Sequence, residues 1–174
     1  AGMPFRSLYE YYLCSSTPQF YHATMEVMQK DLLWYGDDME ECYNDVVYHD
    51  GPDGLEACGK GGVYDASAIE FYVCSRLMWN PRIDIAEARR EFCRRAYKGA
   101  EDIMADYYEK MAKNYNEDPA GCFWNDDPVS AAKHYIVEKN LAPWLRETLT
   151  KAEAQATDPR SKELIRRHRV HIDY

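Results

Sequence analysis

The chain has 174 residues, a formal net charge of −9 and an aromatic content of 14%, including 15 tyrosines. This length suits one domain, or a domain with a remnant of another. The negative charge argues against nucleic acid as a partner, because phosphates are bound by a surplus of Lys and Arg. The sequence has no apolar run long enough to span a bilayer and no charged-then-apolar leader. We therefore predict no membrane segment and expect a cytoplasmic protein.

The cysteine spacing predicts neither a zinc site nor a disulfide framework. No C-x-x-C pair occurs, and no His stands at zinc-finger spacing from a Cys. A chain of this length does not need disulfides to hold its fold. We expect reduced thiols at all six cysteines: Cys14, Cys42, Cys58, Cys74, Cys93 and Cys122.

The first 62 residues read as a strand–helix–strand segment. Leu8–Leu13 is rich in Tyr and Leu and is followed by serines and a proline, which predicts a short strand. Phe20–Tyr35 carries apolar residues at helical spacing, and Gly36 is placed to end that helix. Val46–His49 is a short β-branched and aromatic run before a dense turn signal, which predicts a second strand.

Two further stretches of this segment have residues that could bind a metal ion or a phosphate, but neither stretch matches a known motif. Asp37–Asp45 is acidic, but it lacks EF-hand spacing and the central glycine, so a solvated acidic short helix is preferred to a metal loop. Gly59–Gly62 contains Lys60, yet it lacks the pattern of a phosphate-binding loop. We predict no metal and no cofactor.

Capping signals mark the helices of the stretch 65–111. Ser67 followed by Glu70 fits a capping box, in which the serine oxygen accepts the amide of the third helical residue and the glutamate reaches back. Asp84 followed by Glu87 repeats this signal. Apolar residues at steps of three and four follow each cap, so each cap predicts an amphipathic helix.

Proline and glycine divide the rest of the chain into helices. Asn80–Pro81 ends the first helix of the stretch, and Gly99 allows a break before the next one. Asp127–Pro128 and Asp158–Pro159 each read as an N-cap followed by proline at the first helical position, and Pro143 opens a further helix. The sequence predicts a mainly α, bundle-like domain of five to six helices over 63–174, with one or two short strands near the N-terminus.

Four residues near the predicted strand ends are candidates for ligand contact. Glu10 shares a strand face with Tyr12, and a charge among aromatic residues at a strand end suits a ligand. His49 and Asp50 form the polar pair best placed for acid–base chemistry, although neighbours on a strand point to opposite faces. The alternatives are an exposed glutamate on an edge strand and a pair of turn-forming residues. No carboxylate pair can be named as catalytic.

The sequences of two motifs resemble the C-terminal part of a bacterial family of glycoside-hydrolase-like proteins, domain of unknown function 4838. The first motif is Arg-Leu-Met-Trp-Asn-Pro at 76–81 with Asp84, and the second is Phe92 with Ala-Tyr-Lys-Gly-Ala at 96–100. The end of the chain is similar too, with spaced alanines in a helix and then Arg169-Val170 before Tyr174. The resemblance covers the chain from Leu8 onward.

This resemblance implies a chain that follows or completes a TIM-like barrel acting on carbohydrate. The two predicted strands would then be late barrel strands, and substrate meets such barrels at the carboxyl ends of the strands. Glu10, Tyr12, His49 and Asp50 become candidate substrate contacts. The expected function is the helical C-terminal portion of a carbohydrate-active protein, not catalytic alone, with a glycoside hydrolase as the parent if that parent is an enzyme. The alternative is a stand-alone helical binding or scaffold module with an aromatic partner surface; the oligomeric state stays open.

Overall fold

The computed structural model describes residues 7–10, 12, 21, 23–36, 41–44, 67–118 and 133–173. Most of these residues are helical, so the prediction of a mainly α fold with short N-terminal strands is confirmed. The strands are β1 (Ser7–Glu10) and β2 (Glu41–Asn44). The helices are α1 (Met25–Tyr35), α3 (Ala68–Trp79), α4 (Ile85–Ala96), α5 (Glu101–Glu117), the π-helical turn η2 (Lys133–Val137), α7 (Ala142–Gln155) and α8 (Pro159–Asp173).

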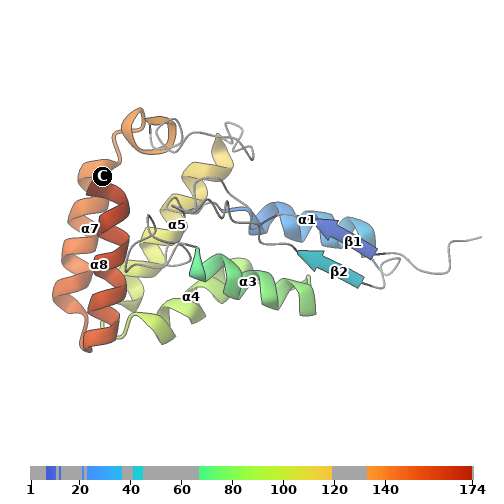
Figure 1. Ribbon diagram of the computed structural model, residues 1–174, viewed down its shortest axis with the longest axis horizontal. Coiled ribbons are helices and arrows are strands. Elements are labelled where there is room, and N and C mark those ends of the chain that lie inside the picture. Colours follow the sequence, from blue (N-terminus) through green and yellow to red (C-terminus); the bar gives the residue numbers. More distant parts are fainter. Residues whose placement is uncertain are drawn as a thin grey trace, which may run out of the picture.

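Neighbours in the sequence are mostly neighbours in space. α3 packs on α4, α4 on α5, α5 on α7, and α7 on α8, while α1 packs on α3. Figure 1 shows α7 and α8 side by side at one end of the molecule and α1 with the two strands at the other. α3, α4 and α5 lie between these ends and connect them.

Two hydrophobic clusters hold these helices together. The larger cluster joins α4, α5, α7 and α8 and is rich in tyrosine and alanine. The smaller cluster joins α1, α3 and the start of α4. Met25 and Met28 of α1 are fully buried in it, as their helical spacing predicts. A fully buried Met or Leu side chain contributes about 1.5–3 kcal/mol relative to exposure, so α1 depends on α3 and α4 for its stability.

The predicted helix starts differ in how they are capped. The Asp84 carboxylate accepts the amide of Glu87 at 2.9 Å, as predicted for α4. Asp158 accepts the amides of Arg160 and Ser161 at the start of α8, at 3.0 and 3.1 Å. Ser67 makes no such bond at the start of α3, so the capping box predicted there is wrong.

Gly99 provides the predicted break between α4 and α5. Its φ angle of +84° lies in the left-handed region that side chains disfavour. A Cβ atom there would also lie 2.6 Å from Cγ2 of Thr157 and 2.7 Å from the Gln155 carbonyl oxygen. The loop between α7 and α8 therefore packs directly against the glycine, and Thr157 donates its amide to the Lys98 carbonyl.

The strands form a parallel pair joined by α1, in the register Ser7–Glu41 to Glu10–Asn44. The acidic short helix predicted within Asp37–Asp45 is wrong for Glu41–Asn44, which is β2. Pairing with β1 supplies backbone hydrogen bonds that outweigh the weak local preference of an acidic segment. The strand predicted at Val46–His49 lies outside the described residues. The described part of the chain contains this two-stranded sheet and no closed barrel.

Two further expectations concern the thiols and the membrane. The described cysteines, Cys42, Cys74 and Cys93, form no disulfide with one another. None of the described helices combines the length and the apolar composition needed to cross a bilayer.

Candidate functional site

The structure places two of the four predicted ligand residues at one end of β1. Glu10 is the last residue of β1 and is paired in register with Asn44. Tyr12 follows it, and its hydroxyl donates to Asp31 of α1 at 2.7 Å. His49 and Asp50 lie outside the described residues. Tyr12 thus joins the strand end to α1.

A buried ion-pair cluster lies where α1, α3 and α4 meet; we call Tyr21, Glu26, Glu70 and Arg89 the Arg89 cluster. Arg89 of α4 donates to Glu70 of α3 through Nε at 3.0 Å and Nη2 at 3.2 Å. It also donates to Glu26 of α1 through both terminal nitrogens. The Tyr21 hydroxyl donates to Oε1 of Glu70 at 2.6 Å. One guanidinium thereby connects three helices.

The sequence did not reveal this cluster, because Glu70 fits a capping box as well as a buried ion pair. Its side chain is fully buried, on the same face of α3 as Ile69 and Val73. Arg89 is likewise buried beside Ala88 on α4. The signal that could have found the pair is one acid and one base, each among the apolar positions of neighbouring helices, since buried charges are paired.

Burial and neighbouring charge shift the titration of the cluster. Burial raises the pKa of Glu70 above its ordinary value, against the lowering effects of Arg89 and of the Tyr21 hydrogen bond. Burial and the Glu70 charge raise the pKa of Tyr21 well above its ordinary value, which keeps the phenol protonated. The guanidinium of Arg89 stays charged, because the adjacent Tyr21, Glu70 and Glu26 more than offset the effect of its burial on its pKa.

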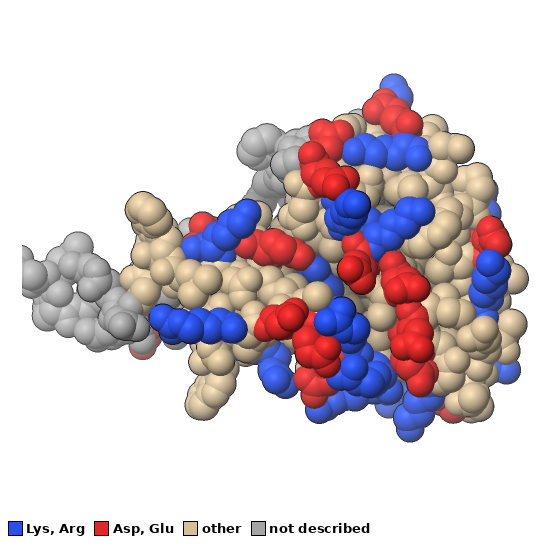
Figure 2. Space-filling model, turned by 180° about the vertical axis from the view of Figure 1, so that it is seen from behind, with Lys and Arg blue, Asp and Glu red and all other residues tan. Residues whose placement is uncertain are grey.

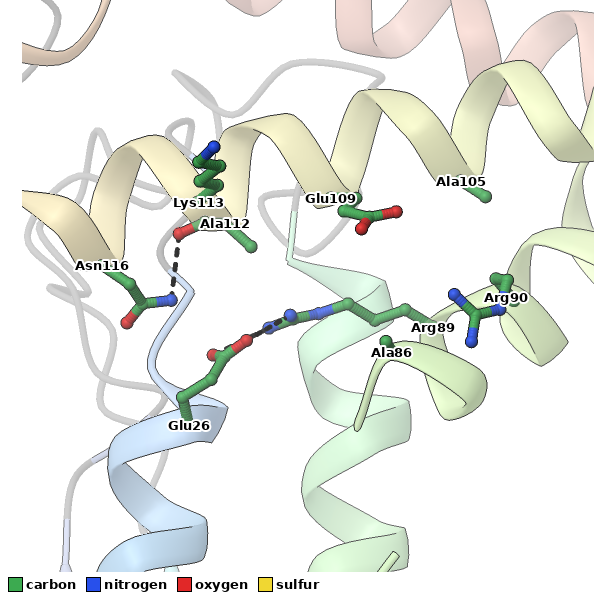
Figure 3. A pocket seen from close by; sticks show the side chains of 9 residues that line it. All are labelled: Glu26, Ala86, Arg89, Arg90, Ala105, Glu109, Ala112, Lys113 and Asn116. Atoms are coloured by element: carbon green, nitrogen blue, oxygen red, sulfur yellow. Dashed lines mark hydrogen bonds and ion pairs between the residues drawn. The ribbon is translucent and has the colours of Figure 1, made fainter. Parts of the chain in front are cut away.

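A pocket of about 250 Å³ opens beside the cluster, between α1, α4 and α5. Figure 3 shows Glu109 and Asn116 extending from α5 toward the pair formed by Glu26 and Arg89. Glu26 is the exposed member of that pair, with 31% of its side chain accessible. The pocket is lined by Glu26, Ala86, Arg89, Arg90, Ala105, Glu109, Ala112, Lys113 and Asn116. It combines polar groups of both signs with three small alanine side chains.

A second polar group is buried in the larger hydrophobic cluster. The hydroxyls of Tyr97 and Tyr108 are 2.8 Å apart, and each lies within 2.9 Å of Nε2 of His168. All three side chains are buried. They hydrogen-bond to one another and do not line the pocket beside the Arg89 cluster, so we assign them to stabilising the packing of α8 on α4 and α5.

Two tryptophans are almost fully exposed near helix ends. Trp34 in the last turn of α1 is 86% exposed, and Trp79 at the end of α3 is 92% exposed. Figure 2 shows alternating acidic and basic side chains over the broad helical part of the face seen there. The narrower extension carries tan side chains that protrude from it, together with blue Lys or Arg and red Asp or Glu side chains. Tryptophan is enriched at interfaces, because its ring is large and apolar and its N–H can hydrogen-bond.

The described residues contain no group of three His, Cys, Asp or Glu side chains that could hold a metal ion. The chain matches no protein-family model, no curated protein and no solved structure. Function therefore has to be argued from the residues themselves.

Proposed function

We propose that this chain is the helical C-terminal portion of a glycoside-hydrolase-like, carbohydrate-active protein, and that it is not catalytic alone. The observation that carries the proposal is the parallel pairing of β1 and β2 across α1. This strand–helix–strand unit is the repeating element of α/β sheets and barrels. The motifs at 76–81 and 96–100, which resemble the glycoside-hydrolase-like family, supply the substrate class.

A two-stranded parallel sheet of four-residue strands is incomplete on physical grounds. Parallel sheets occur with both faces covered, and an isolated strand pair is marginal in water. Among the described residues each strand pairs only with the other, so the outer edge of each has no described strand beside it. We propose that the rest of a larger protein supplies further strands, so that Glu10 and Tyr12 lie at the substrate-facing end of its sheet.

The two acids of the Arg89 cluster do not form a catalytic pair. Glycoside hydrolysis uses two carboxyl groups that flank the scissile bond, about 5–10 Å apart. The two acids of the Arg89 cluster are both engaged by one guanidinium, and Glu70 is fully buried. Neither can approach a sugar as an acid or a nucleophile without breaking the cluster.

The test compares the isolated chain with the intact protein encoded by its gene. Both are assayed against a panel of aryl glycosides and oligosaccharides, with purity and folding checked by circular dichroism. Turnover by the intact protein alone is expected. Full activity of the isolated chain would refute the non-catalytic assignment, and an intact protein inert on every sugar would refute the substrate class.

A second function is favoured by Trp34 and Trp79: a stand-alone binding or scaffold module that uses an aromatic surface. Light scattering and native mass spectrometry of the isolated chain separate the two proposals. A stable oligomer that is lost in Trp34→Ala and Trp79→Ala favours the module. A monomer in both cases, which associates only with the remainder of the intact protein, favours the first proposal.

A further inference from the structure

We propose that the pocket between α1, α4 and α5 binds one neutral polyhydroxylated ring, the size of a monosaccharide. The site lies within the helical part and is separate from the strand ends, so it goes beyond the proposed function. The inference rests on the proposed function in one respect only: the proposed function makes carbohydrate the biological ligand.

The volume of the pocket limits the ligand to a single small ring. Pockets for drug-sized ligands span about 300–1,000 Å³, and this one has about 250 Å³. Its alanines, Ala86, Ala105 and Ala112, leave this space open, because each ends at its Cβ atom. A hexose ring can place its carbon–hydrogen face on these methyl groups.

Hydrogen-bond donors and hydrogen-bond acceptors are both left available around the pocket. Arg89 uses four of its N–H groups on Glu70 and Glu26. A guanidinium has five, so one N–H on Nη1 remains. Arg90 donates only through Nε, to Glu87. Both arginines therefore present unused donors to the pocket.

The acceptors come mainly from α5. Glu109 has no hydrogen bond or ion pair with any other described residue, and it lines the pocket. The amide nitrogen of Asn116 donates to the Ala112 carbonyl at 2.9 Å, which leaves its side-chain oxygen as an acceptor. Glu26 adds partly exposed lone pairs. Hydroxyl groups both donate and accept, so vicinal hydroxyls match such a wall better than a purely anionic or cationic ligand does.

The charge balance also favours a neutral ligand. Arg89, Arg90 and Lys113 face the pocket as cations. Glu26 and Glu109 face it as anions, and Glu70 lies directly behind Arg89. These three cations and three anions cancel in formal charge, and Arg90 and Lys113 also pair with Glu87 and Glu117 outside the lining. The pocket therefore has charged hydrogen-bonding partners but no positive surplus for an anion.

The arrangement is held in place before any ligand arrives. Arg89 is fixed by two carboxylates from two other helices, and burial keeps it in one position. Preorganised groups lose less conformational entropy on binding than mobile ones. With about a dozen non-hydrogen atoms in the ligand, we expect a Kd in the millimolar range.

Saturation-transfer-difference NMR on the isolated chain tests the proposal. The probes are glucose, galactose, mannose and N-acetylglucosamine, with glucuronate and inorganic phosphate as charged comparisons. Glu109→Ala should weaken binding of a neutral sugar about tenfold by removing a charged acceptor. Its control is Asp102→Ala, an exposed acid on the same helix that does not line the pocket.

A second variant fills the pocket instead of removing a charge. Ala86→Leu should abolish binding, whereas Ala154→Leu, at an exposed position of α7, should leave it unchanged. Absence of any signal from neutral sugars, binding of phosphate or glucuronate alone, or binding unchanged by both pocket variants would each overturn the proposal. These outcomes concern the isolated chain, so they are independent of whether the intact protein turns over glycosides.

Discussion

Replacing Arg89 by Met removes the cation that pairs with the buried carboxylate of Glu70. Breaking a buried ion pair from one side costs about 3–5 kcal/mol, because an uncompensated charge stays behind. Most of this cost comes from the fully buried Glu70, since Glu26 can turn to water. Domains are stable by about 5–15 kcal/mol, so the variant should lose a large fraction of its free energy of unfolding.

Urea unfolding followed by circular dichroism measures this loss. Arg94→Met is the matched control on the same helix, because both Arg94 and its partner Glu87 are about half exposed, and it should change little. Combining Arg89→Met with Glu70→Leu and Tyr21→Phe removes every buried polar partner. The triple variant should recover most of the stability, because apolar replacement of a whole buried cluster is close to neutral.

The loss should also depend on pH. Burial raises the pKa of Glu70, and loss of Arg89 raises it further. The ionic part of this loss is therefore absent below the folded pKa of Glu70 in the wild type, which burial already holds above the unfolded value of about 4.3. It grows as the pH rises toward the higher folded pKa of the variant and is constant above that value. A loss under about 1 kcal/mol at pH 7, or a triple variant as unstable as the single one, would refute the assignment of the cluster as a buried ion pair.

Three further predictions address single positions. Gly99→Ala should destabilise more than Gly36→Ala, because both have positive φ but only Gly99 would place its Cβ against another loop; thermal unfolding compares them. Hydrogen bonds from Ser161 lower the pKa of Asp158. The carboxylate of Asp158 therefore stabilises the folded chain at pH values above its unfolded pKa of about 3.9. This stabilisation is lost as the pH falls through the folded pKa. Asp158→Asn should flatten the acid limb of the stability curve. Burial raises the pKa of Cys93 to about 12, so iodoacetamide at pH 8 should leave this thiol unmodified until urea unfolds the chain, and rapid labelling of native protein would contradict this.

Local signals in the sequence predicted most helices of the part that the structure describes. Backbone geometry ends or begins helices at Asn80–Pro81, Gly99 and Asp158–Pro159. This geometry acts over one or two residues and needs no tertiary partner. α3, α4, α5 and α8 accordingly lie close to where the pattern predicts them. The helix predicted to start at Phe20 begins at Met25 instead.

Pairing between distant segments could not be predicted in the same way. Glu41–Asn44 is acidic and weakly β-forming, and it is a strand because β1 lies beside it. The predicted contacts Glu10 and Tyr12 were placed at the end of a strand by the sequence, but the bond from Tyr12 to Asp31 depends on how α1 returns over the sheet.

The sequence by itself determined the helical class, the helix ends marked by Asp84, Gly99 and Asp158, and the burial of Met25 and Met28, because these follow from spacing and backbone preference. Only the tertiary structure decided that Glu70 pairs with Arg89 and that Arg89 borders a pocket between α1, α4 and α5. A glutamate three residues after an N-cap serine has the same local pattern whether it caps the helix or pairs with a neighbouring helix. Packing of α3 against α4 and α1 selects the second outcome, since it removes Glu70 from water and leaves Arg89 as the partner that can compensate its charge.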